Sequence, residues 1–200
     1  LEEVLENVFL GEKSDHRTLL RRMSGEVLTV LDPSALMDTV LNTLREGVPA
    51  RTTVLLITPP THAPIVRGFG GGVDLDAIAG IPREALDRWT EGNPIAHRAE
   101  IAALAEERGV SEVVAPLLKT KPYLLLPLRH AGQLLGVIAL GRKITETRYT
   151  AEEISLLQTL TNQTSVAVKN AVLHEESLAK IVLEEELAVA RRIQQQFLPR

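Results

Sequence analysis

The sequence predicts an α+β domain: an antiparallel sheet of five or six strands with flanking helices, followed by a long C-terminal coiled-coil helix. Two observations support this fold class. Short apolar runs bounded by turn residues indicate strands, and the clearest hairpin joins Tyr123–Arg129 to Gln133–Arg142 through residues 130–132. Amphipathic helical segments flank the strands in segregated order, which is typical of an α+β fold. We expect the helices to pack on one face of the sheet.

The composition restricts the class of protein. With 200 residues, 44% hydrophobic and 24% charged, the chain suits one globular domain with extensions. It contains no cysteine, so it has no disulfide, no thiol nucleophile and no cysteine-held metal or cofactor. The net charge of −4 gives no general attraction to nucleic acid or anionic lipid. We therefore expect no nucleic acid partner.

The apolar runs and the two ends of the chain bear on its setting. The runs Tyr123–Leu128 and Leu134–Leu140 are too short to span a bilayer. We expect a cytoplasmic protein that does not enter a membrane. Because the chain begins at Leu1 and stops one residue after Pro199, we also expect it to be a piece of a longer protein.

Residues 1–31 predict two amphipathic helices, separated by a break at Gly11–Asp15. The second helix carries Leu20, Met23 and Val27 on one apolar face. We expect this N-terminal region to serve in signalling and dimerisation.

The domain begins with a helix in which Asp32 is the N-cap and Pro33 the first helical residue. The run Thr52–Thr58 is apolar and β-branched, which predicts a central strand, and a second strand follows near Ile65–Phe69. Residues 70–72 are three glycines that form a turn. They do not match a phosphate loop, because no Gly-Lys-Ser/Thr follows.

Further along, the sequence predicts helices at Pro82–Trp89 and Ala99–Arg108, with a brief strand at Ile95–Arg98 between them. The last fifty residues open with a capping box, Thr150 to Glu153. No Pro or Gly then occurs before the end region, and strong helix formers dominate. These features predict one helix of about 70 Å, longer than a small domain needs for its own core.

Two segments resemble the C-terminal half of a GAF domain: YLLLPLRHAGQLLGVIALGRK and YTAEEISLLQTLTNQTSVAVKNA. They contain a strand ending in Pro-Leu, a turn with Gly, a strand with Gly-Val-Ile-Ala-Leu, and a helix ending at Ala167–Ala171. The resemblance covers about residues 32–171 and is less specific in its N-terminal half. It implies a sheet with a ligand pocket on one face, helices on the other, and frequent dimerisation.

The run LEEELAVARRIQQQFLP, Leu183–Pro199, resembles the segment that precedes bacterial SpoIIE/RsbU-type serine phosphatase domains of the type 2C class. By this resemblance, residues 172–200 are a coiled-coil linker into a phosphatase domain outside this sequence. The chain itself is then a regulatory sensor, not an enzyme, and holds no cofactor; Mg²⁺ or Mn²⁺ would bind only in the phosphatase domain. The whole protein would dephosphorylate a phosphoserine or phosphothreonine on a regulator of the anti-anti-sigma type.

The long helix predicts a parallel homodimeric coiled coil. One seam steps by four and three through Ala167, Ala171, His174, Leu178 and Ile181. A second seam, in a shifted register, runs through Leu183, Leu187, Ala190, Gln194 and Phe197. Such a shifted coil suits a switch, because two packings can differ by only a few kcal/mol. The expected dimer and linker contacts are Leu20, Met23, Val27, Ala171, Leu178, Ile181, Leu187, Ala190, Ile193 and Phe197.

The candidate ligand contacts are Trp89, His97, Arg98, Arg67 and Tyr123. Ordinary core packing is the alternative for Trp89, and a structural role is the alternative for His97. The five histidines show no spacing typical of a metal site, so no metal is expected. The missing cysteine excludes the GAF domains that hold a bilin through Cys, and the Asn-Lys-x-Asp motif of cyclic-nucleotide GAF domains does not occur. Haem held by His97 stays an open alternative, which no feature of the sequence favours. The ligand therefore stays unknown, and a constitutive dimerisation scaffold with no small-molecule ligand is the alternative function.

Overall fold

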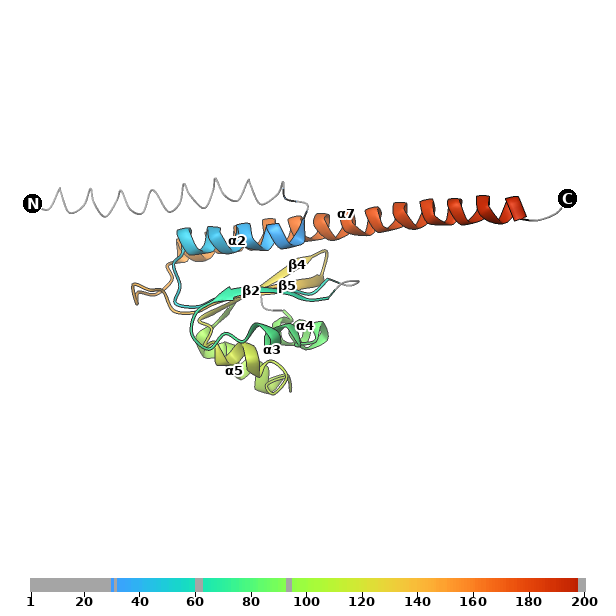
Figure 1. The fold of residues 1–200 in the computed structure, drawn as a ribbon. Coiled ribbons are helices and arrows are strands. Elements are labelled where there is room, and N and C mark those ends of the chain that lie inside the picture. Colours follow the sequence, from blue (N-terminus) through green and yellow to red (C-terminus); the bar gives the residue numbers. More distant parts are fainter. Residues whose placement is uncertain (1–29, 31, 60–62, 93–94, 198–200) are drawn as a thin grey trace, which may run out of the picture.

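The computed structural model describes residues 30, 32–59, 63–92 and 95–197. Among these residues, five antiparallel strands form one sheet in the order β2-β1-β5-β4-β3 (Figure 1). This confirms the antiparallel α+β fold. The strands are β1 (Thr53–Ile57), β2 (Ile65–Phe69), β3 (Ala96–His97), β4 (Leu124–His130) and β5 (Gln133–Leu140).

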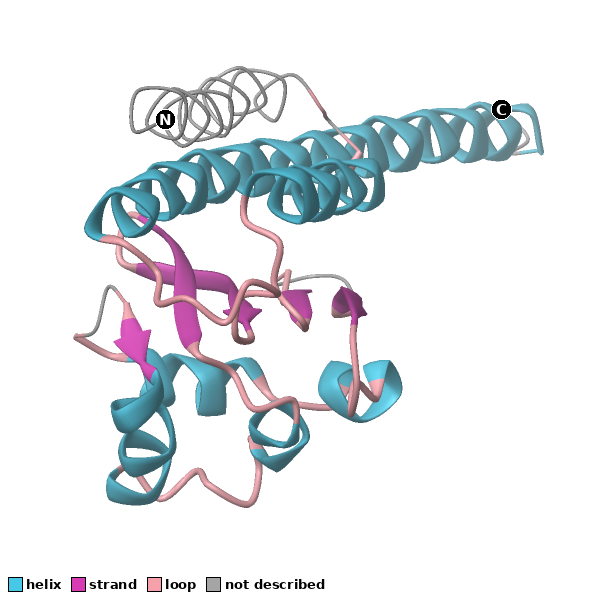
Figure 2. Cartoon of the chain, turned by 90° about the vertical axis from the view of Figure 1, so that its left-hand side faces the viewer, coloured by secondary structure: helices cyan, strands magenta, loops and turns pink. Residues whose placement is uncertain are grey.

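Helices cover both faces of the sheet. Two helices lie along one face, and the short helices lie against the other (Figures 1 and 2). The expectation that helices pack on one face is therefore wrong. The helices are α2 (Pro33–Gly47) and α7 (Ala151–Phe197) on the first face, with α3 (Leu75–Ala79), α4 (Arg83–Thr90), α5 (Arg98–Glu107) and α6 (Ala115–Lys119) on the second.

The central strands explain this two-sided arrangement. All five residues of β1 are buried, so its side chains need apolar partners above and below. Leu55 and Ile57 pack with α2 and α7, whereas Val54 and Leu56 pack with the short helices. The same division continues across β5, where Ile138 belongs to the first cluster and its neighbours to the second.

The space between the sheet and the short helices is filled by side chains rather than by a ligand pocket. Trp89 is fully buried there, and its indole Nε1 donates a hydrogen bond to the carbonyl oxygen of Ile101 at 2.9 Å. Ile78, Leu86 and Leu117 are also fully buried in this cluster. The resemblance implied a pocket on one face of the sheet, but large apolar residues occupy this one.

Both predicted helix starts are present. The Asp32 carboxylate accepts a hydrogen bond from the backbone N–H of Ala35 at 2.6 Å at the start of α2. At α7, the Glu153 N–H donates to the Thr150 hydroxyl at 3.2 Å, and the Glu153 carboxylate accepts from the Thr150 N–H at 2.8 Å. The capping box therefore sets the first turn of α7. Lys143 pairs with the same carboxylate at 2.6 Å, which joins this turn to the end of β5.

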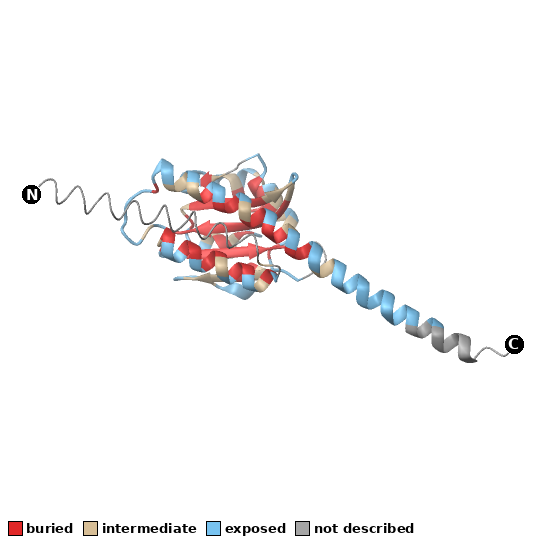
Figure 3. Cartoon of the chain, turned by 90° about the horizontal axis from the view of Figure 1, so that it is seen from above, coloured by how far each residue is buried: buried red, intermediate tan, exposed pale blue. Residues whose placement is uncertain are grey.

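Helix α7 contains 47 residues, so its length is about 70 Å at 1.5 Å per residue. Its first half packs on the domain, and its second half runs out beyond it (Figures 1 and 3). After Val172 no described side chain of α7 is buried. The buried side chains of α7 are Leu157, Leu160, Thr161, Thr164, Ser165, Ala167, Val168, Ala171 and Val172.

Candidate functional site

A basic groove lies at the end of the sheet where β4 begins and β5 ends. It consists of two adjoining hollows of about 580 Å³ each, which share Arg98 and Arg142 in their walls. The first hollow extends towards Tyr123 and the loop before α7, and the second extends towards the end of α6 and the glycine turn after β2. We call this site the basic groove because its walls carry Arg51, Arg98, Lys119, Lys121, Arg142 and Arg148.

Backbone pairing positions several of these cations. Arg98 begins α5 directly after β3, which pairs with the start of β4. Arg142 follows β5, and its carbonyl oxygen accepts a hydrogen bond from the Arg51 N–H at 2.8 Å. Arg51 and Arg142, which are far apart in the sequence, are therefore held side by side by hydrogen bonds of the backbone. Lys121 sits in the link from α6 to β4, where its own N–H donates to the Leu118 carbonyl oxygen at 2.9 Å.

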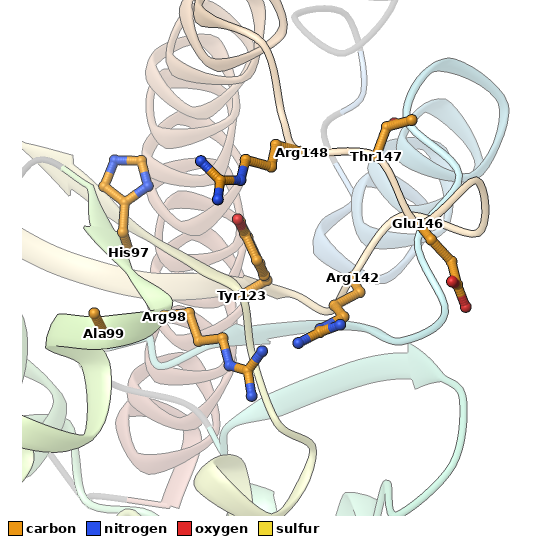
Figure 4. Close-up of a pocket in the computed structure, with 8 residues that line it drawn as sticks. All are labelled: His97, Arg98, Ala99, Tyr123, Arg142, Glu146, Thr147 and Arg148. Atoms are coloured by element: carbon orange, nitrogen blue, oxygen red, sulfur yellow. The ribbon is translucent and has the colours of Figure 1, made fainter.

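The charges of the groove are unbalanced. Glu146 is the one carboxylate among the residues that line the two hollows, and it pairs with Arg51. Figure 4 shows the guanidinium groups of Arg98 and Arg142 turned towards the same space, while the Glu146 carboxylate points away from them. Within the described ranges, neither of these arginines has an ion-pair partner. The arrangement can therefore hold an anion.

Two tyrosines form the wall between the groove and the core. The rings of Tyr123 and Tyr149 lie 5.5 Å apart at 34°. The Tyr149 hydroxyl donates to the carbonyl oxygen of Gly141 at 2.7 Å and is buried. Burial, with smaller contributions from Glu153 and Tyr123, raises the pKa of Tyr149 well above its ordinary value. Tyr149 is thus a neutral anchor, and Tyr123 is the aromatic residue that reaches the groove.

The structure separates the five candidate ligand contacts. His97, Arg98 and Tyr123 come together in the first hollow. Trp89 lies in the core, so it is a core-packing residue, which was the alternative to a ligand contact. Arg67 lies away from the groove, where its guanidinium donates to the Asp38 carboxylate at 3.0 Å and to the Ser34 hydroxyl.

The other cations of the groove were not expected from the sequence. They belong to no local motif, because they come from three segments that lie far apart along the chain: Arg51, then Lys119 and Lys121, then Arg142 and Arg148. Only the clustering of Arg and Lys at both ends of predicted strands could have pointed to them.

The exposed half of α7 is the second candidate site. Leu178, Ile181 and Val182 are 50%, 52% and 54% exposed, and Leu183 and Leu187 are exposed to a similar degree. We call these five residues the apolar stripes of α7, because they lie on two sides of the helix. At 100° per residue, Leu183 and Leu187 lie about 140–180° around the axis from Leu178. The register shift expected from the sequence corresponds to this change of side.

Not every expected interface residue is available to a partner. Ala171 is fully buried within its own chain, so its place in a dimer seam is wrong; it belongs to the half of α7 that packs on the domain. Leu20, Met23 and Val27 lie outside the described residues. Ala190, Ile193 and Phe197 are helical, but their side chains lie outside the description.

Neither a candidate metal site nor a membrane-spanning helix occurs in the described part of the chain. No group of His, Asp and Glu side chains there is placed to hold a metal ion. None of the helices described is both long enough and apolar enough to cross a bilayer. The fold and the groove together define a binding or regulatory domain with an attached helix.

The family model described as "GAF domain" matches residues 30–169. The chain therefore belongs to the GAF domain family, whose members are sensory and regulatory modules. No curated protein matches it in sequence.

Three solved structures match the chain at low sequence identity, and the first of them shares its fold. Residues 122 to 287 of a methyl-accepting chemotaxis protein are 14% identical, with a TM-score of 0.53, over 76% of this chain and 97% of that one. The GAF domain of a phosphoenolpyruvate-protein phosphotransferase from Coxiella burnetii is 16% identical, with a TM-score of 0.47, over 80% and 96% of the two chains. The GAF domain of the cyanobacteriochrome TePixJ is 19% identical, with a TM-score of 0.43, over 72% and 94%.

Proposed function

We propose that this chain is a regulatory GAF module that pairs with a second copy through the outer half of α7 and transmits a signal along it. The observation that carries the proposal is the change in α7 after Val172. The same continuous helix stops packing on its own domain, yet it still presents large aliphatic side chains to solvent. A second copy of this chain supplies the missing apolar partner.

A parallel pair explains why the outer half is helical at all. Most helical stability in proteins comes from tertiary packing of an amphipathic face rather than from propensity. Leu178 and Ile181 lie three residues apart on one side, which is the spacing of a coiled-coil seam. A two-fold axis along the helices would bring the two C-terminal ends together, where a following domain would be attached.

The two sides of the apolar stripes support a switch rather than a fixed rod. If Leu178 and Ile181 form the contact between the two chains, Leu183 and Leu187 lie on a side of α7 that is turned well away from that contact. One straight coil cannot bury both sets against the same partner. Rotation of the pair would exchange the two seams, and packings of this kind can differ by only a few kcal/mol.

The output of the module is a phosphatase domain of the SpoIIE/RsbU type, in this proposal. Support comes from the run Leu183–Pro199, which resembles the segment leading into such domains. The chain itself performs no catalysis in this account. The domain that follows would bind Mg²⁺ or Mn²⁺ and remove phosphate from a serine or threonine of a partner protein in a bacterial cytoplasm.

The decisive experiment compares two neighbouring substitutions in α7. Leu178→Asp places a charge in the first seam, whereas Ala179→Asp places the same charge about 100° further around the helix. Both positions are exposed in the single chain, so neither variant should disturb the fold. Light scattering should give twice the 21.9 kDa chain mass for the unmodified protein and for Ala179→Asp, whereas Leu178→Asp should dissociate at higher protein concentration than either, since only the second seam is left to it.

A single-chain mass for the unmodified protein at every concentration would refute the pairing. So would a pair that Leu178→Asp leaves as stable as Ala179→Asp does. In the longer protein with its phosphatase domain, Leu178→Asp should also change the rate of phosphopeptide hydrolysis. An unchanged rate would mean that the chains pair through α7 but pass no signal to the phosphatase domain.

A constitutive dimerisation scaffold is the second candidate function. The filled space between the sheet and the short helices favours it, because Trp89 and its neighbours leave no cavity there for a ligand. In that case the pair would form in the same way but would respond to no small molecule. The basic groove is the place where the two functions can be told apart.

A further inference from the structure

The basic groove concentrates positive charge in a chain whose net charge is −4. In the described residues, the side chains of Arg98, Lys119, Lys121, Arg142 and Arg148 take part in no ion pair. Each of these cations repels the others, and nothing in the fold of the sheet requires them to gather at one end. These cations are exposed, so water screens much of their repulsion, but together they create a local positive potential that attracts an anion.

A hollow beside α4 provides a contrast within the same domain. Its walls contain arginines too, but they are accompanied by the carboxylates of Glu84, Asp87 and Glu91. Arg129 pairs there with Asp87 at 2.7 Å. In that hollow carboxylates accompany the arginines, whereas among the cations of the basic groove only Arg51 pairs with a carboxylate.

The backbone is also unusual at the groove. In the part of the chain that the structure describes, the non-glycine residues with positive φ are Lys121 (53°), Glu146 (60°) and Ala131 (47°). Ala131 is explained by the tight turn between β4 and β5. Lys121 and Glu146 both line the groove, and strained residues persist where the surrounding structure holds them and cluster at binding sites.

We propose that the basic groove binds a small oxyanion compound with two or more negative charges, of the phosphate or carboxylate class. Arg98 and Arg142 form the centre of the site, because both hollows share them. The planar guanidinium group matches phosphate and carboxylate oxygens with paired hydrogen bonds. The N-terminal end of α5, which begins at Arg98, adds partial positive charge on the same side.

The shape of the groove indicates a small molecule rather than a long polyanion. Each hollow holds about 580 Å³, which lies within the range of small-molecule sites. A nucleic acid strand would also meet the overall negative charge of the chain. This proposal concerns the input to the module and does not depend on whether α7 pairs or transmits.

The test measures binding of pyrophosphate and of citrate to the 200-residue chain by calorimetry and by melting temperature, with ionic strength held constant by KCl. One of the two anions should bind with saturation and raise the melting temperature. Pyrophosphate alone would assign the phosphate class, and citrate alone the carboxylate class. Arg98→Gln and Arg142→Gln should each weaken the binding about tenfold or more, since each removes a charge-assisted contact.

Two further variants make the test specific. Arg88→Gln removes an exposed arginine from the α4 hollow and should leave binding unchanged. Gly71→Asp adds a carboxylate to the second hollow, where a Cβ atom would meet nothing within 4 Å, so the fold should tolerate it while anion binding falls. Melting temperatures without ligand report directly on the folding of each variant.

Three results would overturn the proposal. One is the absence of saturable binding for both anions beyond the KCl control. Another is equal binding by Arg98→Gln, Arg142→Gln and Arg88→Gln. The third is tighter binding of a short single-stranded DNA than of either small anion. Light scattering on the same samples tests the pairing of α7 separately, so the two proposals can fail independently.

Discussion

The two halves of α7 are equally helical but meet very different surroundings. From Ala151 to Val172 the helix lies on the sheet beside α2, and its inner side chains are buried. That buried surface includes small polar residues, Thr161, Thr164 and Ser165. The outer half instead exposes the large aliphatic residues of the apolar stripes. Both halves therefore carry large aliphatic side chains, but only those of the inner half are covered by the chain's own domain, which indicates that the outer half is a surface for another chain.

The polar residues of the inner half are mostly satisfied within the helix. The hydroxyl of Thr161 donates to the Leu157 carbonyl oxygen at 2.7 Å, and that of Ser165 donates to the Thr161 carbonyl oxygen at 2.8 Å. These bonds allow small polar groups to lie against the sheet without loss. The hydroxyl of Thr164 is buried without such a partner, so the apolar residues around it, such as Leu160 and Val168, hold the inner half in place.

The contrast between the two halves is tested most directly by replacing one leucine in each half with alanine. Leu160→Ala should lower the free energy of unfolding by about 2–5 kcal/mol, because Leu160 is buried and a cavity would remain. Leu183→Ala should change it by less than about 0.5 kcal/mol in the single chain. Urea unfolding, at a concentration where light scattering shows single chains, measures both. Equal losses would mean that the outer half also packs on its own domain.

Replacing Tyr149 tests the hydrogen bond that holds the chain just before the inner half of α7. Tyr149→Phe should lower the free energy of unfolding by about 1–3 kcal/mol at neutral pH, since the carbonyl oxygen of Gly141 loses its buried donor. The pKa of Tyr149 is raised in the folded state, so its contribution to stability is complete below the ordinary value near 10 and falls as pH rises above it.

Urea unfolding between pH 8 and 11 checks that dependence on pH. The difference in unfolding free energy between the unmodified protein and Tyr149→Phe should be constant up to about pH 9 and then shrink. A difference that grew with pH would contradict the direction of the shift.

The capping box offers a smaller contrast between two hydroxyl groups. Thr150→Ala should cost about 1 kcal/mol, because the Glu153 N–H loses its acceptor in the first turn of α7. Ser177→Ala removes an exposed hydroxyl that donates to the Leu173 carbonyl oxygen within the outer half, and it should cost nothing measurable. Thermal unfolding of the two variants, followed by circular dichroism, compares them directly. Equal melting temperatures would show that the cap is unimportant.

The smallest expected effect belongs to the ion pair of the outer half. The Lys180 Nζ atom lies 3.9 Å from Oε1 of Glu184, and both side chains are largely exposed. Lys180→Ala should therefore change the free energy of unfolding by less than about 0.5 kcal/mol. The same urea titration suffices, and a loss above 1 kcal/mol would indicate that this pair lies in an interface.

The elements with strong local patterns could be predicted from the sequence. The β-branched run at β1, the turn at Ala131 and Gly132, and the capping residues Asp32 and Thr150 each act within a few residues. The helices α3 and α6 were missed, because five residues are too few to show a helical period. The placement of helices on both faces was missed as well, since an unbroken apolar strand does not say what covers it.

The site was harder to predict than the fold. His97 and Arg98 could be found because they follow a recognisable turn and strand, and Tyr123 because it begins the clearest hairpin. Arg51 and Arg142 come together only through the pairing of β1 and β5, which are far apart in sequence. Ala171 fitted the spacing of a coiled-coil seam, but its own chain buries it. Spacing identifies an apolar side of a helix, but not the surface that it meets.

The loop between β5 and α7 gives the long helix the geometry of a lever. Residues 146–148 line the basic groove, and Thr150 caps α7 three residues after Thr147. The fulcrum is therefore beside the groove, and the projecting arm after Val172 is about 37 Å long at 1.5 Å per residue. Because the far tip lies about 70 Å from this fulcrum, a tilt of about 5° there would sweep the tip through about 6 Å, slightly more than the 5.4 Å rise of a helical turn.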